Sequence, residues 1–276
     1  MRTLVHLSDL HFGRIDRTLV ESLIECVAQL KPDVMAVSGD LTQRARTAQF
    51  MQARRFLDRL PSPQIVVPGN HDVPLYDVFS RFLQPQDKYR RYITNDLEPF
   101  HADDEIAVIG INTARSLTIK GGRINSDQMA RVCARLRPLG AAITKIIVTH
   151  HPFELPGGYG DAALVGRARR AMEMFASCGA DLFLAGHLHV SHTGSTAARY
   201  QISGHSALVV QAGTATSSRA RGESNSFNVI RIDRPYLVVE LFTWRPEQKS
   251  FALSSSERFQ YLSGGWSPIS NDDPVR

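Results

Sequence analysis

The stretch VVPGNHD at residues 66–72 runs from an apolar strand through a Pro-Gly break into three polar side chains. Proline and glycine together permit a sharp change of chain direction. Asn70, His71 and Asp72 offer an amide oxygen, an imidazole and a carboxylate, so all three could face one ligand. The same residues suit an ordinary turn, because turns favour Gly, Asn and Asp for backbone reasons. The rest of the chain must decide between these interpretations.

The residues before this stretch alternate between strand and helix patterns. Period-two and 3.6-residue hydrophobic patterns predict strands over 3–7, 33–37 and 64–67 and helices over 17–30 and 45–60. The resulting β-α-β-α-β order predicts parallel strands joined by crossover helices. Sheets of this kind bind their ligands at the carboxyl ends of the strands. The opening stretch is therefore placed where a site is expected.

The α/β pattern resumes after an irregular helical segment, residues 74–100, which we expect to form a surface excursion near the site. Beyond it we expect strands at 106–111, 143–148 and 181–185 and helices at 125–136 and 167–178. The glycine-containing segment 154–166 is expected to form a mobile loop over the pocket.

After residue 189 the sequence pattern predicts only β-strands. Its expected strands are 199–203, 207–212, 227–232 and 236–243. Residues 254–276 are polar and contain serine and proline, which predicts a loosely held C-terminal tail. We therefore expect one domain over residues 1–253 followed by this tail.

Composition restricts the class of protein only broadly. The 276 residues are 43% hydrophobic, which suits one large domain, and the net charge of +5 suits an anionic substrate. The three cysteines lack metal-ligand spacing and are expected to be reduced, buried thiols. The N-terminus lacks a signal-peptide pattern, and no segment has the length and apolarity of a membrane span. These features predict a cytoplasmic protein without a membrane partner.

Side chains that can bind metal follow five expected strands: Asp9 with His11, Asp40, Asn70 with His71, His150, and His187 with His189. Each one alone could be a helix cap, a buried histidine or a turn residue. Their joint occurrence at the same end of successive strands predicts a metal site instead. In Asp-x-His and His-x-His, an extended backbone places both polar side chains on one side. Mixed imidazole and carboxylate ligands suit transition ions better than Ca or Mg.

The order of these blocks points to a known family. The blocks are Asp-x-His at 9–11, Gly-Asp at 39–40, Gly-Asn-His-Asp at 69–72, His150, and Gly-His-x-His at 186–189. In this pattern the chain resembles the calcineurin-like metallophosphoesterase superfamily, with the β segment after residue 189 as the family's second sheet. The segments HLSDLHF at 6–12 and GTA at 213–215 are similar to its bacterial cyclic-nucleotide phosphodiesterase and glycerophosphodiesterase branch.

The resemblance implies a four-layer α-β-β-α sandwich, two mixed sheets flanked by helices, with a dinuclear metal site at the carboxyl ends of the strands. The implied ligands are Asp9, His11 and His189 for the first metal, Asn70, His150 and His187 for the second, and Asp40 as the bridge. The implied cofactors are two divalent transition-metal ions, Fe or Mn, with Zn, Co or Ni as alternatives. A hydroxide between the ions would attack phosphorus in line with the leaving group.

Two residues of the opening stretch would serve the reaction without binding metal. His71 would donate to the phosphate or to the departing oxygen. Asp72 would either orient the His71 ring or only close the turn, and the sequence leaves both open. Asn70, His71 and His192 are the expected substrate contacts. His151 is expected to point away from His150 if the strand continues.

The expected activity is that of a metal-dependent phosphoric diester hydrolase acting on small phosphodiesters, with 3′,5′- or 2′,3′-cyclic nucleotides first. A glycerophosphodiester or broader phosphoester hydrolase is the alternative, because its metal site would be identical. A DNA nuclease is less expected, since the sequence has no basic stripe with interleaved aromatic residues. A non-catalytic scaffold would have no chemical need for His71 and the intact ligands. A homodimer is one option for the assembly.

Overall fold

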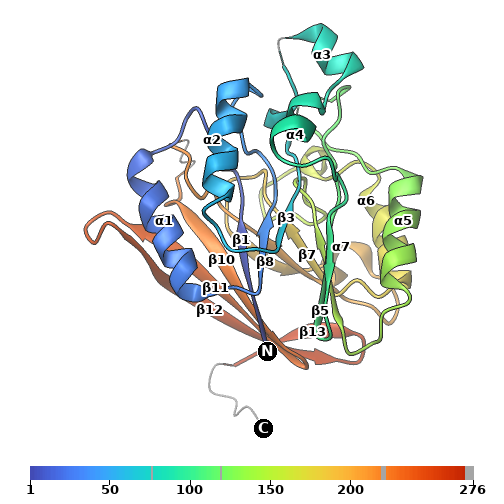
Figure 1. Cartoon of the computed structure of the whole chain (residues 1–276). Coiled ribbons are helices and arrows are strands. Elements are labelled where there is room, and N and C mark those ends of the chain that lie inside the picture. Colours follow the sequence, from blue (N-terminus) through green and yellow to red (C-terminus); the bar gives the residue numbers. More distant parts are fainter. Residues whose placement is uncertain (76, 119, 219–221, 271–276) are drawn as a thin grey trace.

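The computed structural model describes residues 1–75, 77–118, 120–218 and 222–270. Two β-sheets pack face to face, and helices cover the outer side of each sheet (Figure 1). The expected four-layer α-β-β-α sandwich of two mixed sheets is therefore confirmed. Within the described residues, none of the helices combines the length and apolarity needed to cross a bilayer.

The first sheet has seven strands in the order β13-β12-β11-β10-β1-β2-β3. Its strands are β1 (Arg2–Leu7), β2 (Val34–Val37), β3 (Gln64–Val66), β10 (Ser226–Asp233), β11 (Tyr236–Arg245), β12 (Ser250–Leu262) and β13 (Gly265–Ile269). Strands β1, β2 and β3 are parallel, as the β-α-β-α-β pattern predicts. The other four strands continue the sheet in antiparallel pairs beyond β1.

The second sheet has six strands in the order β4-β5-β6-β7-β9-β8. Its strands are β4 (Phe100–Ala102), β5 (Ile106–Gly110), β6 (Thr144–Val148), β7 (Leu182–Ala185), β8 (His192–Ser195) and β9 (Leu208–Gln211). Strands β5, β6, β7 and β9 are parallel, whereas β4 and β8 are antiparallel to their neighbours.

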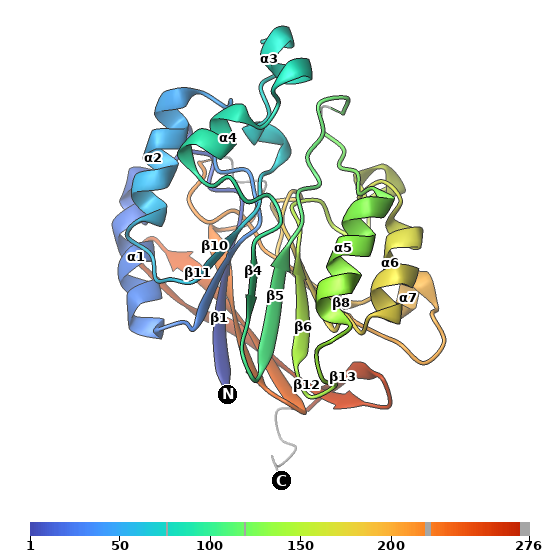
Figure 2. The same ribbon diagram turned by 45° about the vertical axis from the view of Figure 1, so that its right-hand side comes forward.

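Helices form the outer layers and the excursion above them (Figure 2). They are α1 (Arg17–Leu30), α2 (Thr47–Leu57), α3 (Val78–Leu83), α4 (Asp87–Tyr92), α5 (Ser126–Leu136), α6 (Ala168–Ser177) and the short α7 (Ala197–Tyr200). Helix α1 begins where the Asp16 carboxylate accepts a bond from the Thr18 amide at 2.9 Å. It buries one apolar stripe that includes Leu19, Leu23 and Val27. The expected excursion at 74–100 contains α3 and α4, while its residue 76 lies outside the described residues.

Three buried apolar clusters hold the four layers together. Val5 and Leu7 of β1 face α1 and α2, whereas Leu4 of the same strand faces the second sheet. On the second sheet, Ile147 faces α5 and α6 while Ile146 faces β1 and β2. Both faces of each central strand are therefore covered, which explains why these strands are apolar throughout.

The predicted C-terminal tail is wrong, and the predicted second sheet is right only in part. Of the strands after residue 189, β8 and β9 join the second sheet beside β7, whereas β10 to β13 extend the first sheet from β1. Residues expected in the tail form most of β12 and all of β13. Phe259 and Trp266 are buried between the sheets, while Ser254, Ser255 and Ser256 are exposed or partly exposed and give the segment its polar composition. The domain therefore extends past residue 253, and residues 271–276 lie outside the described residues.

The expected strand at 199–203 is also wrong, because this segment contains the end of α7. Arg199 pairs with Glu154 at 3.1 Å and with Asp161 at 2.7 Å. The neighbouring Tyr200 hydroxyl donates to the Phe153 carbonyl. A strand would send these adjacent side chains to opposite faces, whereas one helical turn lets both reach the segment at 153–161.

The cysteines correct another expectation. Helices α5 and α6 lie side by side, and Cys133 and Cys178 form a disulfide with their Cα atoms 5.4 Å apart. Cys26 is half-buried and free. The prediction of three reduced thiols is therefore wrong for the pair. Sequence spacing could not reveal it, because the two cysteines are 45 residues apart and meet only through helix packing.

Candidate active site

The expected metal-binding side chains meet at one edge of the sandwich. Asp9, Asp40 and Asn70 follow β1, β2 and β3, while His150 and His187 follow β6 and β7. Parallel strands place their carboxyl ends at the same edge, and face-to-face packing brings the two edges together. Contacts across this junction are direct, since the His187 amide donates to Asp9 Oδ2 at 2.9 Å.

The first ligand group contains Asp9, His11, Asp40 and His189, whose potential ligand atoms all lie within 4.8 Å of one another. His189 Nε2 lies 3.1 Å from Asp9 Oδ1 and 3.2 Å from His11 Nε2. His11 Nε2 also lies 3.7 Å from Asp40 Oδ2. All four side chains are buried, so they form a closed polar cluster.

The second ligand group contains Asn70, His150, His187 and again Asp40. His150 Nε2 lies 3.1 Å from Asn70 Oδ1, 3.3 Å from His187 Nδ1 and 3.4 Å from Asp40 Oδ1. Asp40 thus turns one oxygen toward each group. The structure therefore brings together all seven side chains that the sequence nominated as ligands.

The backbone at these positions is strained. Asp9, His11, Asp40, His187 and His189 all have positive φ, between 50° and 75°. This left-handed conformation costs a residue with a Cβ about 1–2 kcal/mol. Such strain persists only where the surroundings fix it, and it concentrates at functional sites. The clustering of five such residues supports a functional rather than a structural role for the edge.

Two glycines create the space in which the carboxylates lie. A Cβ on Gly69 would overlap the Asp40 carboxylate, and a Cβ on Gly186 would overlap Ser8 Oγ and Asp9 Oδ2. The glycines of Gly-Asn-His-Asp and Gly-His-x-His are therefore required by close approach.

The pKa values of Asp9 and His187 are shifted toward the protonation states that metal ligands need. Burial raises the pKa of Asp9, but the His189 and His11 rings outweigh burial, and this pKa lies well below its ordinary value. Burial and the neighbouring His150 lower the pKa of His187 to about 4. Ionised carboxylates and neutral imidazoles are the forms that coordinate cations.

A cation would also satisfy a buried atom of this edge. Asp9 Oδ1 is buried and accepts no hydrogen bond from the described residues. Ligand atoms about 2.1 Å from one ion lie about 3.0–3.5 Å from each other, close to the spacings in both groups. The nitrogen and oxygen donors suit borderline transition ions. The residues present thus fit two divalent ions that share Asp40.

His71 faces the same edge but is held by a different partner than expected. Its Nδ1 lies 2.8 Å from the carbonyl oxygen of Gln43, to which a protonated Nδ1 donates. Its Nε2 is then left on the side of Asp40 Oδ2, 4.0 Å away. The role of Gln43 cannot be recognised in the sequence, because it depends on a backbone carbonyl, which every residue type carries.

Asp72 closes the turn, which is one of the two roles that the sequence leaves open for it. Its Oδ1 accepts from the Thr42 amide at 2.8 Å and the Thr42 hydroxyl at 2.9 Å. Its Oδ2 accepts from Leu41 and Gly69 at 3.0 and 2.9 Å. Burial and then Asp40 raise the pKa of Asp72 to about 6, against the effect of these hydrogen bonds. Asp72 thereby ties the loop that carries Asp40 to the loop that carries Asn70.

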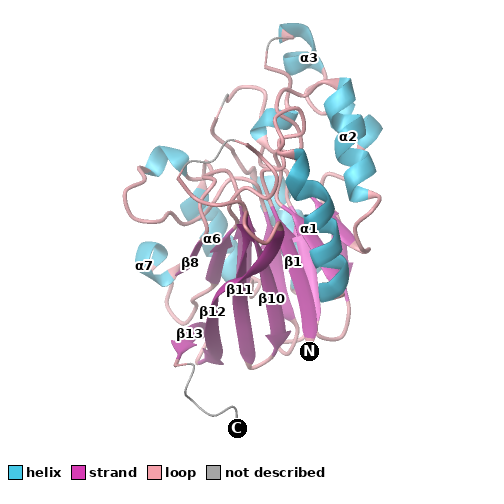
Figure 3. Ribbon diagram, turned by 90° about the vertical axis from the view of Figure 1, so that its left-hand side faces the viewer, coloured by secondary structure: helices cyan, strands magenta, loops and turns pink. Residues whose placement is uncertain are grey.

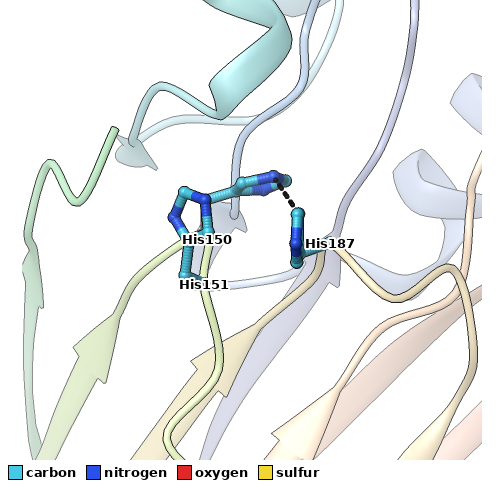
Figure 4. Close-up of side chains that lie close together, drawn as sticks. All are labelled: His150, His151 and His187. Carbon is cyan, nitrogen blue, oxygen red and sulfur yellow. Dashed lines mark hydrogen bonds between the residues drawn. The ribbon is translucent and has the colours of Figure 1, made fainter. Parts of the chain in front are cut away.

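His151 lies beside the second ligand group, contrary to the expectation that it points away (Figure 4). Its ring packs edge-on against His150 with centroids 4.9 Å apart. However, Nδ1 lies 2.8 Å from Thr113 Oγ1 and Nε2 lies 3.1 Å from the Lys120 carbonyl. With both nitrogens engaged, His151 holds Thr113 and the Lys120 backbone rather than completing a third ligand set.

A cavity of about 570 Å³ opens above both ligand groups. Asp40, Asn70, His71, His187 and His189 form its polar base. Its other walls come from Gln43, Arg44, Val73, Leu75, Lys120, Tyr159, Gly160, Ala162, Ala163 and Leu188. The segment expected to lie over the pocket, 154–166, thus contributes to its wall. This volume suits a small molecule.

His192, an expected substrate contact, does not line the cavity above the ligand groups. His192 begins β8 and lines a separate cavity together with Asn228 and Glu257. The chain turns after His189, so closeness in sequence to the His-x-His block does not place residue 192 at the catalytic edge.

Comparisons with known proteins agree with this architecture. Glycerophosphodiester phosphodiesterase GpdQ of Enterobacter lignolyticus is 26% identical over 163 residues, which are 55% of this chain and 58% of that protein. A dimetal phosphatase from Danio rerio has a TM-score of 0.62 at 13% identity, covering 86% of this chain and 95% of its own. Purple acid phosphatase PPD1 from yellow lupin has a TM-score of 0.71 at 11% identity, covering 93% and 53%. The two structures support the fold alone.

Two mixed sheets with a histidine–carboxylate cluster at their joined edges define a class of α/β sandwiches with a candidate metal centre. The family model for calcineurin-like phosphoesterases matches residues 2–191, which include every nominated ligand. The chain therefore belongs to the calcineurin-like phosphoesterase family.

Proposed function

We propose that this protein is a dinuclear-metal phosphodiesterase that hydrolyses small phosphodiesters, with cyclic nucleotides as the preferred class. The observation that carries the proposal is Asp40, whose two oxygens belong to separate ligand groups beneath one cavity. Asp9, His11 and His189 would hold one ion, and Asn70, His150 and His187 the other. Fe and Mn are the first candidates, with Zn, Co or Ni as alternatives.

The protein side of the mechanism follows from the hydrogen bonds. When bound, two divalent cations supply Lewis acidity, which acidifies water and offsets the charge of a phosphate group. His71 keeps its Nδ1 proton on the Gln43 carbonyl, so only its Nε2 can serve the cavity. As an imidazolium, His71 would donate the Nε2 proton to the departing oxygen. Asp72 contributes indirectly, because its hydrogen bonds to Thr42 and Gly69 fix the loops on which Asp40 and Asn70 lie.

Three features of the cavity support a small diester. Its volume of about 570 Å³ matches a small molecule, and its polar base is joined by the apolar residues Val73 and Leu75. Arg44 and Lys120 bring positive charge to the same wall. Tyr159 adds an aromatic ring that can stack on a base.

A glycerophosphodiester substrate is the alternative, and the similarity to GpdQ favours it. The ligand groups would serve both reactions equally. A kinetic comparison of 3′,5′- and 2′,3′-cyclic nucleotides, glycerophosphodiesters and single-stranded DNA separates the substrate classes. The proposal ranks cyclic nucleotides first by kcat/KM.

The decisive test measures metal and turnover on the same preparation. We expect two transition ions per chain and hydrolysis of bis(p-nitrophenyl) phosphate that chelation abolishes. Replacing His71 by Ala should lower kcat about 100- to 1,000-fold with metal content unchanged, because proton donation is lost. His101→Ala is the matched control, since His101 lies on β4, the edge strand of the second sheet, and does not line the cavity. Full activity in a metal-free sample, or equal kcat for the two variants, would refute the mechanism.

A further inference from the structure

Exposed apolar side chains lie on two segments that adjoin residues of the catalytic cavity. Phe79, Phe82 and Leu83 on α3 are 73%, 52% and 64% exposed, and Leu117 is 83% exposed. Tyr159, in the cavity wall, is 37% exposed. Large exposed side chains of this kind are common singly, but a cluster beside a site indicates an interaction surface. We call α3 together with Leu117 the apolar tip.

A buried arginine joins the two parts of the apolar tip. Arg81 of α3 is only 6% exposed. Its guanidinium donates to the Pro74 carbonyl at 2.9 Å and to the Thr118 carbonyl at 2.7 Å. Helix α3 and the segment with Leu117 are therefore tied together.

The apolar tip borders the opening of the cavity. Leu75 precedes α3, Lys120 follows the segment with Leu117, and both residues line the cavity. Helix α3 projects beyond the rest of the molecule in all three views (Figures 1, 2 and 3). Whatever covers the apolar tip therefore lies close to the catalytic entrance.

We propose that the apolar tip docks on the surface of an anionic lipid bilayer. The exposed phenylalanine and leucine side chains enter the boundary between headgroups and acyl chains, while Lys120 and Arg44 at the adjoining wall face the negative headgroups. The net charge of +5 acts in the same direction. Such docking needs no membrane-spanning helix, so it replaces the expectation of a protein without a membrane partner.

The dimensions of the apolar tip favour a bilayer over a second copy of the chain. A full aromatic side chain covers about 150–250 Å², so four partly exposed side chains offer on the order of 500 Å². A stable protein interface needs about 800 Å² from each partner. A narrow projection fits a soft surface into which it can insert, whereas a protein partner would require a matching recess.

Docking would turn the cavity entrance toward the interface, so that a phosphodiester at the headgroup level could reach the base. This consequence rests on the proposed function, whereas docking itself does not. A binding measurement therefore fails independently of any measurement of hydrolysis.

The test is cosedimentation of the full chain with vesicles. We expect stronger binding to phosphatidylcholine vesicles that contain phosphatidylglycerol than to phosphatidylcholine alone, and weaker binding at high salt. The double variant Phe79→Ser with Leu83→Ser should reduce the partition coefficient about tenfold or more, because it removes two of the inserted side chains.

A matched control is the double variant Leu253→Ser with Leu262→Ser on β12, whose side chains are 51% and 49% exposed. It should bind vesicles like the wild type, and thermal unfolding should show both double variants folded. Failure of the wild type to bind, or equal loss in both double variants, overturns the proposal. It is also overturned if ultracentrifugation shows a dimer that the Phe79→Ser and Leu83→Ser changes dissociate while vesicles bind nothing.

Discussion

The base and the rim of the cavity are built in different ways. At the base, Asp9, His11, Asp40 and His150 are fully or almost fully buried, and their atoms are fixed by contacts between both sheets. At the rim, α3 and Leu117 expose large apolar side chains. A hydrogen bond from Arg81 to the Thr118 carbonyl connects these two segments. The base is rigid enough to hold strained backbone, whereas the rim is open to solvent.

This difference separates two tasks. Strain and buried charge can be maintained only where dense packing fixes them, so the chemistry is expected at the base. Selection of the substrate and its surroundings is expected at the rim, because loops tolerate change without loss of the core. Substitutions at the base should therefore affect kcat or stability, and substitutions at the rim should affect KM or binding.

The largest effect is expected from Asp40→Asn at the base. The amide removes the negative charge that both ligand groups share and replaces one of the two oxygens by NH2, so kcat for bis(p-nitrophenyl) phosphate should fall about 1,000-fold or more. Bound metal, measured by mass spectrometry on the same sample, should fall with it. Asp103→Asn, at the opposite end of β5 from the ligands, is the control. A variant that keeps a tenth or more of the activity would contradict the shared role of Asp40.

Asp72→Ala distinguishes a structural residue of the base from a catalytic one. Four hydrogen-bond donors lose their acceptor, and the free energy of unfolding should fall by about 3 kcal/mol. Urea unfolding measures this loss, and Asp104→Ala, whose side chain is 84% exposed, should change stability little. If Asp72 instead orients His71, the variant will keep its stability and lose kcat as His71→Ala does.

His6 allows a test by pH of whether the buried region beside the cavity base keeps a histidine uncharged. Burial lowers the pKa of His6 to about 3, so the unfolded chain takes up a proton below pH 6.5 that the folded chain refuses. The stability contributed by neutral His6 is therefore present above the unfolded pKa and lost as pH falls. The wild type should lose about 2 kcal/mol more than His6→Gln between pH 7 and pH 5.

Urea unfolding in the presence of a chelator measures this pH dependence without a contribution from metal release. His101→Gln is the control for the change of residue type, because the His101 side chain on β4 is 29% exposed, whereas His6 is buried. An equal loss of stability for wild type and His6→Gln would show that the region around β1 admits water or charge.

The smallest effect is expected at the rim, from Lys120→Ala. The Lys120 ammonium is exposed, so its attraction to an anionic substrate is weak, and KM should rise about threefold while kcat stays within about twofold. Lys249→Ala, on the turn between β11 and β12, is the control with the same change of net charge. A large fall in kcat would place Lys120 among the residues of the base.

Sequence patterns were informative where structure is local. Helix α1 begins and ends at the predicted residues, because its apolar stripe and the Asp16 cap both lie within one short segment. The strands near the C-terminus are harder to predict from sequence patterns. Strand β12 carries three consecutive serines, Ser254 to Ser256, between the buried Phe251 and Phe259. Such a polar run resembles a tail until the partner strands are known.

The sequence by itself determined which side chains would meet at the catalytic edge. Asp9, Asp40 and Asn70 follow parallel strands of the first sheet, and His150 and His187 follow parallel strands of the second, so each set shares one edge of its own sheet. The order of the motif blocks predicted that the two sets meet, and the packing of the sheets brings the two edges together. Only the tertiary structure decided what surrounds them: the Gln43 carbonyl on His71, the turn closed by Asp72, and the apolar tip at the rim. These features depend on backbone atoms and on contacts between distant segments, and residue types alone encode neither.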